Sequence, residues 1–382
     1  MAGMLIEHVR IAGLASAVPE DVQTLDDLAA QFGEEEAGKI AESIGVRTRR
    51  VAPEGMCASD LCHAAAEKLL DDMEWDRDSI RGLIFVSQTP DYRSPATACT
   101  LHSRLKLSKS CAAMDINLGC SGYVYGLATA AQFVRGLSNG NESSGRVLLL
   151  VGDTITRVVS AEDRSAVPLF GDAGTATALD YSESADPISV VFGTDGAGQD
   201  HLIVPAGGFR NPSTESTAQP TERENGNVRS DEDLFMNGAE VFMFTLCEVP
   251  SLFKKTMKAS GWSIDDVDGV IMHQANSFML NHLRKRLKIP EEKFVIALDG
   301  YGNASCASIP LAITDGWANK GPETRRKLVL AGFGVGWSWA GATVNCEQTV
   351  MPELIVLSGA ACQSTDGEDA PITETVEISK AA

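Results

Sequence analysis

The chain repeats one local pattern, and the two copies lie about half a chain length apart. In residues 75–88 a tryptophan and a polar turn lead, seven positions later, to a glycine and a short apolar stretch, and residues 262–274 have the same order. A second pair, residues 146–152 and 327–332, consists of a basic residue, an apolar run and a glycine. The offsets of the two pairs, 187 and 180 residues, nearly agree. This agreement predicts an internal duplication, with chance likeness of two α/β turns as the alternative.

The duplication divides the chain into an N-terminal half near 1–180 and a C-terminal half near 181–350. The remaining segment, 351–382, is acidic, and we expect it to be a flexible tail. Residues 207–233 form a long polar stretch with two prolines, which is typical of a lid or of a disordered loop.

Short apolar runs that do not alternate with polar residues predict strands covered on both faces. These runs occur at 83–86, 147–151, 270–272 and 328–331. Helical candidates fall at 60–72, 121–135, 239–259, 276–287 and 308–319. Strands that alternate with helices indicate a layered α/β architecture.

The charge balance excludes two classes of partner. With 32 Lys and Arg against 52 Asp and Glu, the net charge of −20 disfavours nucleic acid and anionic membrane surfaces. Nine cysteines without a repeating spacing are typical of reduced thiols in a cytoplasmic protein. Cys57, Cys62 and His63 lack a second pair at zinc-finger spacing, so we expect no metal and no bound cofactor. The first residues are a poor signal peptide, and no apolar run reaches the roughly 20 residues that span a bilayer.

Cys120 is the strongest candidate for a nucleophile. It lies at the join between an apolar stretch and a helix of small residues, with Gly119 before it and Ser121 and Gly122 after it. A thiol at a helix N-terminus meets the positive end of the helix dipole, which favours the thiolate. The alternative is a buried structural cysteine, which is the commoner state of a free cysteine.

Two further segments supply matching chemistry. His273 closes an apolar strand, and Asn303 lies in a glycine-containing loop. A core histidine and an asparagine that holds its own turn are the alternatives. Residues 332–339 contain three glycines, but they lack the adjacent lysine–serine or lysine–threonine pair of a nucleotide loop. Their N–H groups are therefore candidates for an oxyanion hole. A thiol, an imidazole and a carboxamide together are suited to acyl transfer.

With these motifs, the chain resembles the β-ketoacyl-acyl-carrier-protein synthase III family of the thiolase superfamily. The resemblance runs from about residue 5 to about residue 347, and its motifs occur in the family order. They are residues 45–50, 89–92, 117–122, 169–176 and 236–242, and the segments around His273, Asn303 and Gly336.

The resemblance implies a five-layered αβαβα fold built from two duplicated halves, usually as a homodimer. It implies Cys120 as the nucleophile, His273 and Asn303 as its partners, and an oxyanion hole from the backbone N–H groups of Cys120 and Gly336. The implied reaction is a decarboxylating condensation of an acyl thioester with a malonyl-carrier thioester through acyl-Cys120, in fatty-acid or specialised lipid synthesis. An acyltransferase that makes an ester or amide, and a non-catalytic partner subunit, are the rival functions.

A basic cluster points to a protein partner. Arg284, Lys285, Arg286 and Lys288 lie within five residues of an otherwise acidic chain, so they are expected to dock an acidic acyl carrier protein. A solvated helix face is the alternative.

The chain departs from the family pattern in two places. Lys39 and Ser43 stand where acetyl-CoA-primed members usually have a tryptophan and an arginine, which leaves CoA or a carrier protein open as the first donor. Ser94 stands before Pro95 where a bulky residue is frequent, and we expect it to widen the acyl pocket.

Overall fold

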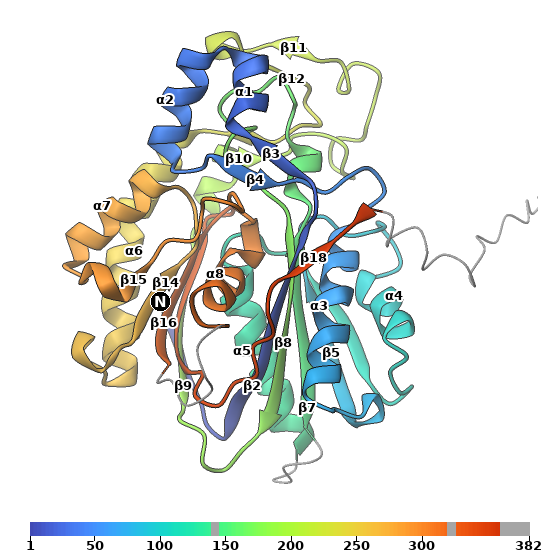
Figure 1. The fold of residues 1–382 in the computed structure, drawn as a ribbon, viewed down its shortest axis with the longest axis vertical. Helices are drawn as coiled ribbons and strands as arrows, with labels where there is room; N and C mark the ends of the chain where they lie inside the picture. The colour runs from blue at the N-terminus through green and yellow to red at the C-terminus, as the bar shows by residue number, and fades with distance from the viewer. Residues whose placement is uncertain (139–144, 319–325, 360–382) are drawn as a thin grey trace, which may run out of the picture.

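The computed structural model describes residues 1–138, 145–318 and 326–359. Two six-stranded sheets form its centre (Figure 1). From edge to edge the first sheet contains β18 (Ile355–Leu357), β2 (Val9–Pro19), β8 (Ala173–Tyr181), β7 (Arg146–Asp153), β5 (Ile80–Val86) and β6 (Ala112–Ile116). The second contains β1 (Ala2–Ile6), β9 (Ile188–Thr194), β17 (Ser338–Asn345), β16 (Lys327–Gly334), β14 (Gly269–Met272) and β15 (Phe294–Val295).

The two sheets match strand by strand. In each sheet, the last five strands in the order above form four neighbouring pairs. The first two pairs are antiparallel and the last two are parallel. The sequence repeats fall on β5 and β14 and on β7 and β16, which occupy equivalent positions. The predicted duplication is therefore confirmed.

Helices separate and cover the sheets, which gives five layers (Figure 1). The middle layer contains α5 (Gly122–Ser138) and α8 (Ser308–Trp317), and both contact strands of both sheets. The outer layers contain α3 (Ala58–Asp72) and α4 (Thr97–Arg104) on the first sheet, and α6 (Gly238–Ser260) with α7 (Ser277–Leu287) on the second. Because α5 packs between two sheets, it needs the small and apolar residues that surround most of its circumference.

Smaller elements gather at one end of the sheets (Figure 1). They are α1 (Leu25–Phe32) and α2 (Glu34–Ile44), and the two-stranded pairs β3 (Val22–Thr24) with β4 (Thr48–Arg50), β10 (Leu202–Ile203) with β13 (Phe235–Met236), and β11 (Thr221–Glu222) with β12 (Val228–Arg229). The polar stretch 207–233 contains β11 and β12, so it holds a short hairpin rather than being wholly irregular.

The first strand of the chain, β1, and the last, β18, each pair with the sheet of the other half. β1 belongs to the N-terminal half by sequence, but it pairs with β9 in the second sheet. β18 lies in the expected flexible tail, but it pairs with β2 in the first sheet, so that expectation is wrong for residues 355–357. The apolar side chains of Ile355 and Leu357 pack on the core beneath α3, which explains why this part of the tail is held. Residues 360–382 of the tail lie outside the described residues.

The buried core follows the layers. One cluster of buried side chains fills the space around α5 and α8, a second lies under α6 and α7, and a third lies under α3 and α4. In the described part of the chain, no helix is both long and apolar enough to cross a bilayer.

We predict that Gly174→Ala destabilises the protein because α3 lies directly on β8. A Cβ at Gly174 would come within 2.5 Å of the backbone nitrogen of Cys62. Overpacking of this kind costs about 1–3 kcal/mol, which urea denaturation would measure as a lower free energy of unfolding. Gly136→Ala is the matched control, because Gly136 is in α5 with nothing within 4 Å of its Cβ position. It should stabilise by about 0.5–1 kcal/mol, and equal effects at both sites would contradict the close packing.

Candidate active site

Cys120 lies in the turn between β6 and α5, where the two halves touch. Its side chain is 9% exposed. Two glycines of β16, from the other half, face this turn: a Cβ at Gly334 would lie 2.7 Å from Cys120 Sγ, and one at Gly332 would lie 2.9 Å from the Cys120 carbonyl oxygen. Residues with side chains would push β16 away from the sulfur. The glycines therefore bring the C-terminal half against Cys120.

The ionisation of Cys120 differs from the sequence prediction. Burial raises the pKa of the Cys120 thiol to about 12, and the nearby charge of Asp153 acts in the same direction. At the start of α5, the N–H group of Gly122 donates to the Gly119 carbonyl at 2.6 Å. The expected stabilisation of a thiolate by the helix N-terminus is therefore wrong for the free enzyme, in which the thiol is neutral.

His273 follows β14 and is fixed from both sides. Its backbone N–H donates to the carbonyl of Ala331 on β16 at 2.8 Å. Its Nδ1 lies 2.8 Å from Ser308 Oγ at the start of α8, and its ring meets the Phe333 ring edge to face. Burial lowers the pKa of His273 to about 3, against a smaller opposing effect of the Ser305 backbone. The imidazole is therefore neutral at physiological pH.

Asn303 lies in the loop before α8 and is 4% exposed. Its backbone N–H donates to the Leu169 carbonyl at 2.8 Å, and its carbonyl accepts from Gly171 N at 3.1 Å. Its side-chain Oδ1 accepts from Ser305 N at 3.0 Å, and Nδ2 lies 3.4 Å from the Ala275 carbonyl. With its oxygen engaged, the amide presents Nδ2–H as its donor.

The three side chains meet in one cavity. A cavity of about 90 Å³ is lined by Cys120, His273 and Asn303, together with apolar residues that include Phe170 and Phe333. A second cavity, of about 370 Å³, also reaches Cys120 and contains Val335 and Gly336 in its lining. Cys120 thus lines two cavities, and only the smaller of them is also lined by His273 and Asn303.

The backbone donors at the sulfur are those of Cys120 and Val335. Both N–H groups act to lower the pKa of the Cys120 thiol, so both are close to Sγ. Gly336, which the sequence suggested, lines the larger cavity but is one residue further along. Gly336 as the second oxyanion donor therefore stays a prediction, and Val335 joins it as a candidate because its N–H is close to the sulfur.

The predicted peripheral residues lie apart from the sulfur. Ser94 is exposed in the loop before α4, and it does not line either of the two cavities at Cys120, so its place in an acyl pocket stays a prediction. In α7, Arg284 is half-buried and pairs with Glu291 at 3.2 Å. Lys285, Arg286 and Lys288 are exposed.

Sequence reasoning missed an apolar surface next to this basic cluster. Phe278 of α7 is 60% exposed and Met243 of α6 is 55% exposed. The Phe278 ring contacts that of Phe242 with 5.6 Å between centroids. Their neighbours Val241 and Met279 line the cavity of His273 and Asn303, so this surface lies at that cavity's side of the molecule. The sequence signal for this surface is Phe278, an aromatic residue at a position where the pattern of the helix predicts a polar one.

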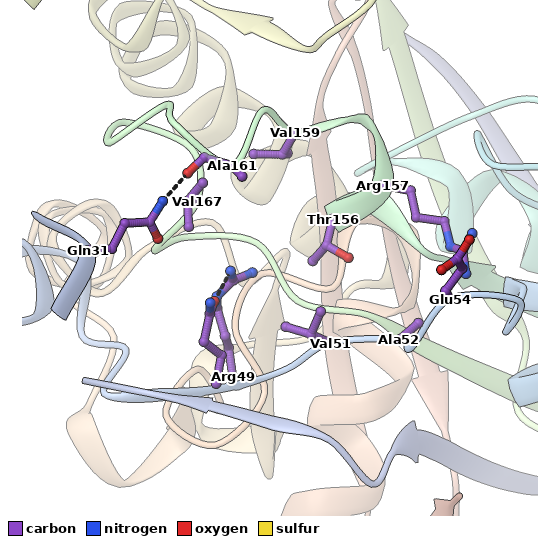
Figure 2. A pocket seen from close by; sticks show the side chains of 11 residues that line it. Gln31, Arg49, Val51, Ala52, Glu54, Thr156, Arg157, Val159, Ala161 and Val167 are labelled. Carbon is purple, nitrogen blue, oxygen red and sulfur yellow. Dashed lines mark hydrogen bonds between the residues drawn. The ribbon is translucent and has the colours of Figure 1, made fainter. Parts of the chain in front are cut away.

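A third cavity, of about 340 Å³, is separate from the nucleophile (Figure 2). Its lining includes Gln31 of α1, Arg49 of β4, and Thr156 and Arg157. Arg49 donates to the carbonyl of Phe170 and to Gln23, which are structural contacts between the small strands and the core. Within residues 1–138, 145–318 and 326–359, no cluster of three or more His, Cys, Asp or Glu side chains is placed to hold a metal ion.

The positions that replace the expected tryptophan and arginine lie on α2. Lys39 pairs with Glu35 at 2.7 Å on the exposed face of that helix, and Ser43 is also exposed. Neither offers an aromatic surface for an adenine ring.

Comparison with protein families gives two matches. Residues 114–196 match the family model described as 3-oxoacyl-acyl-carrier-protein (ACP) synthase III, and residues 257–346 match the model of its C-terminal part. The first match contains Cys120, and the second contains His273 and Asn303.

Relatives extend over most of the chain. A β-ketoacyl-acyl-carrier-protein synthase III of Rhodopirellula baltica is 36% identical over 357 residues, which cover 88% of this chain and 98% of the relative. One of Caldanaerobacter subterraneus is 33% identical over 337 residues, with 88% and 97% covered. A crystal structure of a 3-oxoacyl-acyl-carrier-protein synthase from Burkholderia xenovorans is 43% identical and aligns with a TM-score of 0.86, covering 93% of this chain and 99% of that one.

We predict that alkylation of Cys120 by iodoacetamide accelerates throughout the range from pH 7 to pH 9. Because the pKa of the thiol is raised, the reactive thiolate is a small fraction at pH 7 and grows about tenfold per pH unit. Mass spectrometry of digested protein would follow Cys120, with the exposed Cys247 of α6 as an internal control for the reagent. A rate that levels off below pH 8 would show that the site holds a preformed thiolate.

Proposed function

The chain belongs to the 3-oxoacyl-acyl-carrier-protein synthase III family of condensing acyltransferases with the thiolase fold, and we propose that it joins an acyl group, held on Cys120, to a malonyl thioester with loss of CO₂. The observation that carries this proposal is that Cys120, His273 and Asn303 line one cavity, although they come from three distant parts of the chain. The product is a β-ketoacyl thioester for fatty-acid or specialised lipid synthesis.

The first half-reaction forms the acyl-enzyme. Since the Cys120 thiol and the His273 imidazole are both neutral, the thiol proton moves to the imidazole as Sγ attacks the thioester carbonyl. The backbone N–H groups of Cys120 and Val335 stabilise the oxyanion that forms. When the tetrahedral intermediate collapses, the carbon–sulfur bond of the donor breaks and the leaving thiolate takes the proton.

The second half-reaction makes the carbon–carbon bond. A malonyl thioester loses CO₂, and the electron pair of the broken bond becomes an enolate whose oxygen carries negative charge. Nδ2–H of Asn303 and Nε2–H of His273 are the two donors for that oxygen. The enolate carbon then attacks the carbonyl carbon of acyl-Cys120, the bond from that carbon to the Cys120 sulfur breaks, and the sulfur takes a proton from solvent to regenerate the thiol.

Ser308 suits a histidine that must serve both steps. Its hydroxyl lies 2.8 Å from Nδ1 of His273 and is able to accept from Nδ1–H or to donate to a bare Nδ1. The first arrangement leaves Nε2 as a base, and the second gives it a hydrogen to donate. Burial keeps the ring neutral in both.

We propose pantetheine thioesters as substrates, with an acyl carrier protein as the partner that delivers the malonyl group. Lys39 and Ser43 offer no support for an adenine ring, which favours a carrier protein for the first acyl group as well. The exposed Lys285 and Arg286 attract acidic side chains, and the neighbouring Phe278 adds apolar contact area. We also propose a homodimer, for which the outer edge of β6 offers unpaired backbone groups.

We predict that Cys120→Ser abolishes the acyl adduct seen by intact-protein mass spectrometry, because a hydroxyl is a much weaker nucleophile than a thiolate. His273→Ala should slow condensation by roughly 10²-fold or more, because His273 is one of the two donors to the enolate, and it should also slow acylation, in which His273 accepts the thiol proton. Release of CO₂ and the mass of the product would be measured together. Product without CO₂ would identify the rival acyltransferase, and activity that survives in Cys120→Ser would support a non-catalytic role for this cysteine.

We predict that the double variant Lys285→Glu and Arg286→Glu raises the KM for a malonyl-carrier substrate severalfold at low salt, with a small effect on kcat. The control is Lys109→Glu, which changes an exposed charge in the loop after α4, on the opposite outer layer (Figure 1). Carrier kinetics that are the same in both variants would place the docking surface elsewhere.

A further inference from the structure

The larger cavity at Cys120 has a mixed lining. Its volume of about 370 Å³ is in the range of small-molecule binding sites. Much of its wall is apolar and comes from side chains such as those of Ile155, Phe170, Leu202 and Leu234. Four polar side chains interrupt this wall, and they are Gln88, Asn117, Gln199 and Ser305. A role for these four groups in binding the acyl group on Cys120 rests on the proposed function.

None of the four polar side chains has a hydrogen-bond partner in the described part of the chain. Ser305 is only 3% exposed and Gln88 is half-buried, whereas Asn117 and Gln199 reach solvent. The buried Gln274 nearby shows the opposite arrangement. Its Nε2 donates to the Met272 carbonyl at 2.6 Å, and its Oε1 accepts from Ala297 N at 2.8 Å. The side chain of Gln274 is therefore paired within the protein, whereas those of Gln88 and Ser305 are left to face the cavity.

The two least exposed groups lie at the sulfur end of the cavity. Gln88 Oε1 packs so closely on Gly119, the residue before Cys120, that a Cβ there would be 2.1 Å from it. Ser305 follows Asn303 by two residues, and its N–H donates to Asn303 Oδ1 at 3.0 Å. Both side chains are consequently near the carbons that directly follow the thioester carbonyl of a bound acyl group.

Their positions are also fixed by the backbone. Gln88 N donates to Oδ1 of the buried Asp153 at 2.7 Å, and Ser87 Oγ donates to the same oxygen at 2.9 Å. Ser305 has a positive φ of 46°, which is rare for a residue with a side chain. A strained serine whose hydroxyl faces a cavity is the kind of local cost that functional sites retain.

We propose that the first acyl group carries a hydroxyl or keto oxygen on one of the carbons next to the thioester carbonyl, with an apolar remainder. Gln88 and Ser305 would hydrogen-bond that oxygen, while the aliphatic wall receives the rest of the chain. A plain hydrocarbon acyl group would displace water from both side chains and leave them without partners. Sites built to pair a polar substrate group discriminate against analogues that lack it for this reason.

The test compares acylation rates for a matched pair of donors. Butyryl and 3-hydroxybutyryl thioesters of N-acetylcysteamine would be offered to the full chain, and intact-protein mass spectrometry would follow the adduct. We expect the hydroxylated donor to react at least about tenfold faster. Equal rates, or a faster reaction of the butyryl donor, would overturn the inference and leave the proposed function standing. Failure of both donors, and of longer acyl-carrier thioesters, to add mass at Cys120 would defeat the proposed function itself.

Variants assign the preference to the two side chains. Gln88→Leu removes the amide at similar size and should lower the ratio of the two rates towards one. Ser305→Gly removes the hydroxyl while suiting the positive φ, and it should act in the same direction. Gln31→Leu is the matched control, because Gln31 lines the separate cavity of Figure 2 and should leave the ratio unchanged. A ratio that is unaffected by both active-site variants would overturn the assignment even if the wild-type preference is present.

Discussion

The close contact between β16 and the turn that carries Cys120 is the constraint on which the site depends. Gly332 and Gly334 leave no room for a side chain between the strand and the sulfur. The contact is reinforced by a hydrogen bond of 2.7 Å between Ser121 and Ser338, again one residue from each half. Because β14 pairs with β16, the same approach carries His273 to the nucleophile. The proposed active site is thus a product of how the two halves pack.

The electrostatics of the site follow from its burial. Cys120 and His273 both lie in apolar surroundings, and burial disfavours the charged form of each, so the resting pair is a thiol and a neutral imidazole. A preformed ion pair would need charged neighbours to stabilise it, and the nearest carboxylate, Asp153, acts against a thiolate. Reactivity in such a site comes from proton transfer during attack and from backbone donors that are already in place. The strongly acidic surface of the protein has little part in this chemistry.

Much of the fold could be predicted because several strands and helices appear in the sequence as continuous apolar runs or as long helical stretches. The runs at 147–151 and 328–331 correspond to β7 and β16, and the predicted helix at 239–259 corresponds to α6, within a few residues at each end. The strands β2, β8, β9 and β17 were missed, because small residues and threonines such as those of β8 lack the apolar signal of a buried strand. Their places are dictated by neighbours in the sheet, which no local pattern records.

The candidate site, like the fold, could be predicted from the sequence only in part. Cys120, His273 and Asn303 could be proposed as a set because each has a distinctive neighbourhood in the sequence, and the structure brings them to one cavity. The ionisation of Cys120, the choice between Val335 and Gly336, and the apolar surface at Phe278 depend on depth and orientation, which arise only when distant segments pack.

The exchange of edge strands has a further consequence. Each half completes its sheet with an edge strand from the far end of the chain. The N-terminal strand β1 joins the second sheet, and the C-terminal strand β18 joins the first. A cut in the turn between β8 and β9 would leave each fragment missing an edge that the other one holds, and the ancestral unit of this duplication can no longer be recovered by simply dividing the chain in two.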